Sequence, residues 1–193
     1  MTQVGPLADL LVGLAAKHEP TVRWTHKAIA LASKVAGVSV TAAMMESTLG
    51  RHVARMIRCG VLAELAGKQW ELLVENIRKG DVTTFNQPTF PPGEQRGFGF
   101  HSAPRGALSH WIVIRDGKIA NYQAVVPSTW NAGPRDEKGN RGPYEASLIG
   151  NPVADTELPL EILRTIHSFD PCLACASHVF GPDGEKLVEV KVR

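Results

Sequence analysis

The chain has 193 residues, 44% of them hydrophobic and 21% charged, which is ordinary for a globular protein and enough for one domain with a sizeable core. Its 21 basic and 19 acidic residues are interspersed, so no charged block predicts binding to nucleic acid or to an anionic membrane surface. No apolar run approaches the roughly 18 residues of a membrane-spanning helix, and the N-terminus lacks the basic region and cleavage site of a signal peptide.

The first part of the chain, residues 1–80, carries apolar residues at helical spacing and is expected to be a helical segment. After a first helix, a second is expected over residues 26–35. A longer third helix is expected to be capped by Ser39 or Thr41. Its pattern continues until Gly80, a residue suited to the left-handed position that follows a helix end.

Three arginines of the third helix, Arg51, Arg55 and Arg58, largely share one face. We interpret this face as a solvated or subunit-facing surface rather than as an active-site clamp. Cys59, in the same helix, is interpreted as a small buried hydrophobic residue. Neither interpretation gives this helix a catalytic role.

The middle of the chain changes character. Residues 81–99 are rich in proline and glycine and predict an irregular loop. Residues 110–127 then form two β-rich runs around an Asp-Gly pair, which predicts a β-hairpin. Residues 128–147 again read as loop, and residues 156–167 predict a last amphipathic helix. The expected fold class is α+β, helix-dominated: a helical bundle with a β-hairpin and long irregular loops. A unit with this much irregular chain is expected to be incomplete by itself.

A row of metal ligands stands near the C-terminus, where Cys172, Cys175 and His178 follow one another at intervals of three. If Asp170 caps a short helix and Pro171 opens it, all three ligands share one helical face. The positive end of that helix would favour thiolate over thiol. Soft thiolates at this spacing suit nickel, zinc, copper or iron.

Spacing alone leaves three interpretations of the cysteines open: metal binding, which we favour, a thiol-disulfide role, and purely structural cysteines. Haem attachment needs a histidine directly after the second cysteine, and a four-cysteine iron-sulfur cluster cannot be built from three cysteines. A structural zinc site needs a fourth ligand. The candidates for that ligand are Cys59, His101, His110 and His167.

The stretch "SFDPCLACASHV" resembles the C-terminal nickel-binding signature of nickel-iron hydrogenase large subunits. The stretches "APRGALSHWIVIRDGKIANYQAVVPSTWNAGPRD", "STLGRHVARMI" and "VGPLADLLVG" are similar to that family as well. Together they cover essentially the whole chain in the family's order. The resemblance implies an incomplete part of the hydrogenase large-subunit fold and, as activity, the reversible heterolytic cleavage of dihydrogen by an uptake-type enzyme.

The resemblance also implies a metal centre in which four cysteine thiolates hold nickel and two of them bridge to an iron that carries carbon monoxide and cyanide. Cys172 would bind nickel terminally, and Cys175 would bridge the two metals. His178 and the carbonyl oxygen of Ala124 would bind a magnesium ion or a similar divalent cation.

The diatomic ligands of the iron would lie in a pocket formed by Pro104, Arg105, Val126, Pro127 and Ser128. Cyanide needs hydrogen-bond donors, which Arg105 and Ser128 can supply, whereas carbon monoxide needs an apolar wall such as Val126 and Pro127. Arg105 and Asp170 are similar to a pair that lies over the open coordination position, which would make them catalytic together with the two cysteines.

A full large subunit of this family carries its first Cys-x-x-Cys in an N-terminal region that this chain lacks, so the chain is expected to hold half of the site and to be inactive alone. Three partners are implied: a complementary N-terminal part, a small subunit with iron-sulfur clusters, and a maturation endopeptidase. The endopeptidase would cut after His178, which separates the segment 81–178 from a strand-like C-terminal extension, 179–193. The expected location is cytoplasmic on synthesis, and periplasmic or membrane-associated within a complex. The alternative is a non-catalytic remnant that holds nickel or zinc by itself.

Overall fold

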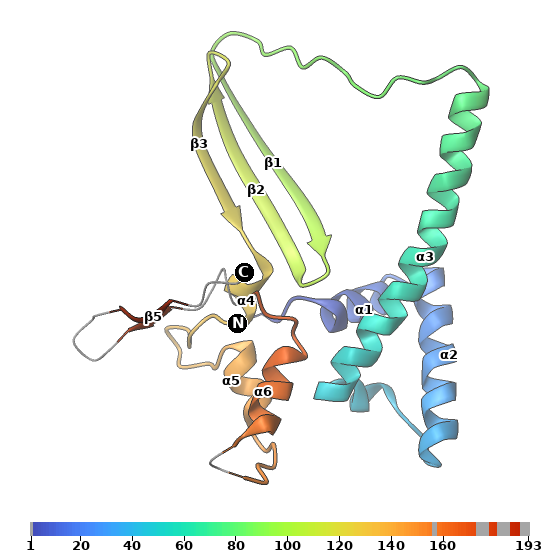
Figure 1. Ribbon diagram of the computed structural model, residues 1–193, viewed down its shortest axis with the longest axis vertical. Helices are drawn as coiled ribbons and strands as arrows, with labels where there is room; N and C mark the ends of the chain where they lie inside the picture. The colour runs from blue at the N-terminus through green and yellow to red at the C-terminus, as the bar shows by residue number, and fades with distance from the viewer. Residues whose placement is uncertain (1, 156–157, 173–177, 181–185, 190–193) are drawn as a thin grey trace.

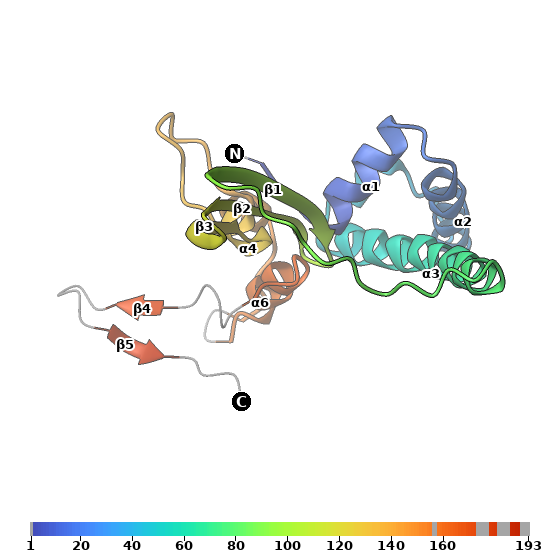
Figure 2. The same cartoon turned by 90° about the horizontal axis from the view of Figure 1, so that it is seen from above.

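The structure is a computed structural model that describes residues 2–155, 158–172, 178–180 and 186–189. Helices α1, α2 and α3 form one side of the molecule, and a three-stranded sheet with short helices near its lower end forms the other (Figure 1). The view from above separates these two sides (Figure 2). Helices combined with a small antiparallel sheet agree with the predicted α+β class.

The helical side begins with α1 (Pro6–Ala15), whose first residue is a proline, and α2 (Glu19–Ala36). Helix α2 starts earlier than the predicted residue 26 because Pro20 opens it. The predicted caps of the third helix are wrong. A 3-10 turn, η1 (Ala42–Met45), follows instead, and the Ser47 hydroxyl caps α3 (Thr48–Arg78) by accepting a hydrogen bond of 3.0 Å from the Gly50 N–H. The end of α3 agrees with the prediction, since Gly80 has a φ of +81°.

The hydrophobic core of the helical side is small. It consists of Leu7, Leu10, Met45, Ala54 and Ile57. By contrast, the outer half of α3 leaves large apolar side chains exposed, namely Leu62, Leu65, Trp70, Leu72, Leu73 and Ile77. Among the described residues, no helix is long and apolar enough to cross a membrane.

The sheet is antiparallel, with strands β1 (Glu94–Ala103), β2 (Gly106–Arg115) and β3 (Lys118–Val125) in sequence order. The predicted hairpin is confirmed, because Asp116 and Gly117 connect β2 to β3 with φ values of 49° and 75°. The predicted loop over residues 81–99 is wrong in its last part, which is strand β1. Phe98 of β1 pairs with Trp111 of β2 and stacks on its ring at 5.1 Å, so cross-strand packing overrides the glycines of this stretch.

Two short helices interrupt the region predicted as loop over residues 128–147. They are α4 (Pro127–Asn131) and α5 (Pro143–Leu148), and each starts with a proline, whose fixed φ suits the first helical position. The last helix, α6 (Leu160–His167), begins later than predicted because Pro159 disfavours helical backbone in the residue before it.

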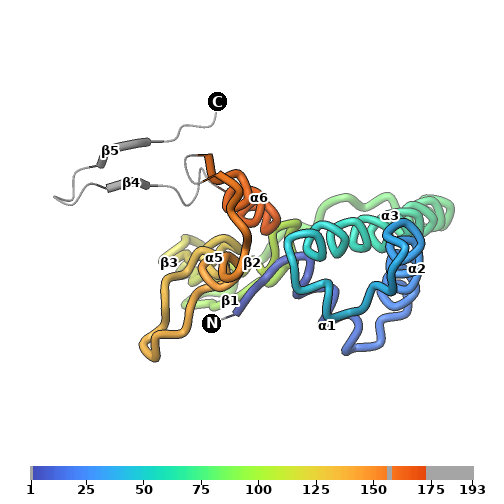
Figure 3. The backbone as a smooth tube through the Cα atoms, turned by 90° about the horizontal axis from the view of Figure 1, so that it is seen from below, coloured from blue at the N-terminus to red at the C-terminus, as the bar shows by residue number. Residues whose placement is uncertain are grey.

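The predicted helix start at Asp170 is wrong. Asp170 has a φ of 58°, in the left-handed region, and its N–H bonds to the His167 carbonyl at 2.9 Å, so it completes the end of α6. Pro171 and Cys172 are not helical. The remainder of the predicted helix, 173–177, lies outside the described residues. Beyond it, β4 (His178–Phe180) and β5 (Lys186–Glu189) form an antiparallel pair (Figure 2). Seen from below, α1, α2 and α3 lie on one side of the molecule and the three-stranded sheet on the other (Figure 3).

Candidate metal centre

The β1–β2 turn, helix α4 and the segment after α6 converge near the lower end of the sheet (Figure 1). Arg105 lies in the turn, and its Nη2 atom is 3.7 Å from Oδ1 of Asp170. Ser128, 4% exposed, accepts a hydrogen bond of 3.1 Å from the Cys172 N–H. The structure therefore brings together Arg105, Ser128, Asp170 and Cys172, which come from three separate segments.

Helix α4 positions Ser128. Val126 is its N-cap and the buried Pro127 its first residue, so the predicted apolar wall and the predicted donor are consecutive in one short element. Tyr144 of α5 hydrogen-bonds with the Ser128 side chain, and burial raises the pKa of Tyr144. The Tyr144 ring lies 5.1 Å from that of Phe169, which directly precedes Asp170. Sequence reasoning missed Tyr144, because only the fold brings α5 to this site.

The N-terminal segment supports the same turn from below. Asn131, 1% exposed, accepts a hydrogen bond from the Val4 N–H and donates one to the Val4 carbonyl, both at 3.0 Å. The chain of Val4 and Gly5 thereby lies against Gly106, where an added Cβ would come within 2.5 Å of the Gly5 nitrogen. The positive φ of Gly106, +125°, completes this close approach. Asn131 was also missed by sequence reasoning.

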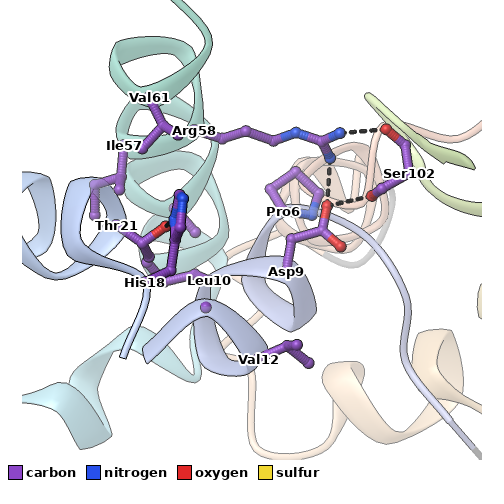
Figure 4. Close-up of a pocket in the computed structure, with 12 residues that line it drawn as sticks. Pro6, Asp9, Leu10, Val12, His18, Thr21, Ile57, Arg58, Val61 and Ser102 are labelled. Carbon is purple, nitrogen blue, oxygen red and sulfur yellow. Dashed lines mark hydrogen bonds and ion pairs between the residues drawn. The ribbon is translucent and has the colours of Figure 1, made fainter. Parts of the chain in front are cut away.

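Arg58 ties α3 to α1 and to the end of β1 (Figure 4). Its guanidinium donates to the Asp9 carboxylate, to the Ser102 carbonyl and, at 2.9 Å, to the Ala103 carbonyl. The Ser102 hydroxyl donates to the same carboxylate at 2.7 Å. This network fixes the backbone directly ahead of Pro104 and Arg105.

Arg51 and Arg55 hold the segment ahead of Asp170. Arg51 is 6% exposed, and its Nε–H donates to the Ser168 hydroxyl at 2.6 Å. Arg55 donates to the Ser168 carbonyl at 2.8 Å. The interpretation of the arginine face of α3 as a solvated or subunit-facing surface is therefore wrong, because all three arginines bond to other segments of this chain. The interpretation of Cys59 as buried is also wrong, since Cys59 is exposed.

The other predicted ligands are not brought together with Cys172 in the described part of the chain. Ala124 lies in β3 opposite His110, whose Nδ1 atom is 2.5 Å from the Tyr122 hydroxyl oxygen. Cys175 lies outside the described residues, and only the backbone of His178 is described. Within the described ranges, no group of three His, Cys, Asp or Glu side chains could hold a metal ion. The donor chemistry nevertheless fits a soft metal, because Cys172 supplies a thiol beside the buried Ser128.

Helices combined with a small antiparallel sheet match part of the large-subunit fold of hydrogenases. The [NiFeSe]-hydrogenase of Desulfomicrobium baculatum superposes with a TM-score of 0.68 at 35% sequence identity, over 91% of this chain and 34% of that chain. The family model "Nickel-dependent hydrogenase" matches residues 1–178. The chain belongs to this nickel-dependent hydrogenase family.

Two similar proteins are large subunits of hydrogenases. The chain is 53% identical over 191 residues to the Hydrogenase-2 large chain of Escherichia coli K12, which covers 98% of this chain and 34% of the relative. It is 45% identical to the Uptake hydrogenase large subunit of Afipia carboxidovorans, over 99% of this chain and 32% of the relative. The chain thus spans about one third of the length of these relatives.

Proposed function

We propose that the chain supplies one part of the nickel-iron site of an uptake-type hydrogenase large subunit, which catalyses the reversible heterolytic cleavage of dihydrogen. The observation that carries this proposal is the convergence of Arg105, Ser128, Asp170 and Cys172 in a chain of the nickel-dependent hydrogenase family. The relatives named uptake hydrogenase large subunits support the direction of the reaction.

The resemblance to the family implies which residues are ligands of the centre. Cys172 and Cys175 would hold nickel through their thiolates, and Cys175 would also bind the iron. His178 and the Ala124 carbonyl would bind a magnesium ion or similar cation. When bound, the nickel and the iron with its carbon monoxide and cyanide ligands supply the place where dihydrogen is activated.

The residues around these ligands have separate tasks. Arg105 and the Ser128 hydroxyl would donate hydrogen bonds to cyanide, while Pro104, Val126 and Pro127 would keep water away from the diatomic ligands. Asp170 orients Arg105 through their ion pair, whose Nη2–Oδ1 distance is 3.7 Å. The proton released from dihydrogen would pass to a cysteine thiolate or to Arg105, the two bases that the resemblance implies, and Arg105 could accept it only in its neutral form.

A four-thiolate centre needs ligands from outside this row of residues. A nickel centre of four thiolates needs two more cysteines than this row contains, and the relatives are about three times as long as this chain. We therefore propose that a complementary N-terminal part of the large subunit completes the centre, and that a small subunit with iron-sulfur clusters carries the electrons away. Synthesis in the cytoplasm would precede any move of the complex to the periplasm or the membrane.

The function is tested by assembly. The purified chain alone is expected to show no hydrogen-dependent dye reduction, whereas co-expression with the complementary part, the small subunit and maturation factors is expected to give it. Turnover by the chain alone would contradict the half-site proposal. One tightly bound zinc in the isolated chain, together with no activity in the assembly, would favour the non-catalytic metal-binding remnant instead.

Processing gives a second test. The family model ends at His178, whereas the alignment with the Escherichia coli relative covers 98% of the chain and so includes most of residues 179–193. We expect a maturation endopeptidase to cut after His178 once nickel is bound. Intact mass spectrometry should then record the loss of residues 179–193 in nickel-loaded samples and not in nickel-free ones. An unchanged mass after loading would mean that the extension is permanent.

A further inference from the structure

Arg51 is a buried cation that forms no ion pair in the part of the chain that the structure describes. Only its Nε–H is bonded among the described residues, to Ser168, and its guanidinium lies 4.1 Å from the centre of the Phe169 ring. The two terminal nitrogens form no hydrogen bond or ion pair within the described part of the chain. Contact with an aromatic face compensates a buried charge only in part, and burial lowers the pKa of Arg51.

A cavity of about 460 Å³ lies beside this guanidinium. Its walls are mostly apolar, from Leu7 and Leu11 of α1 and Pro143 of α5. Two further charged residues line it. Arg141 is already 3.3 Å from its own carboxylate partner, Glu145. Glu46 is exposed and forms no ion pair with Arg51 among the described residues. Water solvates the exposed carboxylate of Glu46, whereas Arg51 is only 6% exposed, so Arg51 is the buried charge of this cavity.

We propose that this cavity receives a carboxylate side chain from the part of the large subunit outside these 193 residues, and that this carboxylate pairs with Arg51. The inference rests on the proposed function, since that function calls for a further part of the large subunit. A planar carboxylate matches the two terminal nitrogens of the Arg51 guanidinium, which favours Asp or Glu over a bulkier anion. The apolar side chains of Leu7, Leu11 and Pro143 in the same lining suit a protein segment rather than a freely diffusing ion.

Pairing at Arg51 would act on the metal ligand segment. Arg51 contacts Ser168 and Phe169, which directly precede Asp170, and Cys172 follows two positions later. Docking of that part of the large subunit would hold the Arg51 guanidinium in place. The guanidinium in turn holds Ser168 and Phe169. Arg51 is a positioning residue in this scheme, because it acts on Cys172 through the backbone.

The test measures binding rather than hydrogen oxidation. The full chain is titrated with the segment of the Escherichia coli Hydrogenase-2 large chain that lies outside the aligned region, produced as a separate polypeptide. Arg51→Gln is expected to weaken binding roughly thirtyfold or more, because it leaves a buried carboxylate unpaired. Arg51→Lys, which keeps the charge and loses the planar fork, is expected to give an intermediate loss. Arg141→Gln is the matched control in the same cavity and should change the affinity less than about threefold.

Several outcomes overturn the inference. Binding of the Arg51→Gln chain within about twofold of wild type would do so, and if that variant does not fold, unaltered binding by the folded Arg51→Lys chain would do the same. If Glu46→Gln lowers the melting temperature of the chain as much as Arg51→Gln does, the partner of Arg51 is internal. If acetate raises the melting temperature of the wild-type chain more than chloride at equal ionic strength, and Arg51→Gln leaves segment binding unchanged, the site is one for small anions. A wild-type chain that does not bind the segment removes the proposed partner itself, a result distinct from loss of binding on mutation.

Discussion

Replacing Cys175 by serine is expected to abolish nickel incorporation and hydrogen oxidation by the assembled hydrogenase. A serine hydroxyl stays protonated at neutral pH and is a hard donor, whereas nickel and iron in this type of centre are held by soft thiolates. Because a single residue that only supports a ligand typically accounts for a 10- to 100-fold effect, loss of a bridging ligand should lower nickel content by more than about 100-fold. Nickel per polypeptide, measured by plasma mass spectrometry, and hydrogen-dependent dye reduction give the two readouts.

The matched control for this substitution is Cys59→Ser. Cys59 is exposed on α3 and bonds to none of the residues around Cys172 that the structure describes, so this change should leave nickel content and activity near wild type. Activity that survives in the Cys175→Ser assembly would remove the bridging assignment. An equal loss in both variants would point to general thiol chemistry rather than to a specific ligand.

Gly106→Ala is expected to have the largest effect on stability. The added Cβ would lie 2.5 Å from the Gly5 nitrogen and 2.8 Å from Cγ2 of Val4, and the φ of +125° is unfavourable for any residue with a side chain. Because backbone cannot yield as a flexible side chain can, we expect a loss of about 3–5 kcal/mol in the free energy of unfolding. Urea denaturation followed by circular dichroism measures this loss.

Gly99→Ala is the control for the glycine prediction. Gly99 lies in the neighbouring strand β1, where an added Cβ meets nothing within 4 Å, so the cost should stay below about 1 kcal/mol. The effect at Gly106 should also reach the site, since the N-terminal segment would leave the turn that carries Arg105. Equal stability losses for the two variants would contradict the close approach of Gly5 to Gly106.

Sequence patterns predicted those elements whose causes are local. Asp116 and Gly117 adopt left-handed backbone at the hairpin turn, and Gly80 does so after α3, because few other residues tolerate that conformation. Strand β1 escaped prediction because its formation depends on pairing with β2, as in the stacking of Phe98 on Trp111. The residues of β1 alone do not indicate which strand will pair with it.

The same difference between local and long-range causes applies to the candidate metal centre. The resemblance supplied Arg105, Ser128, Asp170 and Cys172, and the fold joins them, although their chemical roles stay predictions. The side chains that hold them in place could not be found from spacing. Arg58 reaches Ser102 across 44 positions of the sequence, and Asn131 reaches Val4 across 127. Asp170 misled the analysis because the same residue type serves both helix starts and left-handed helix ends.

The bonds from α3 to Ser168 bear on the order of events during maturation. They join residues 117 and 113 positions apart, so we expect the carboxy-terminal stretch to find its anchor after the long helix has formed. Contacts of such wide sequence separation are made late, since a large loop must close before they form. The thiol of Cys172 would reach its final position near the end of folding. Metal binding would therefore occur only in a chain whose remaining parts have already folded.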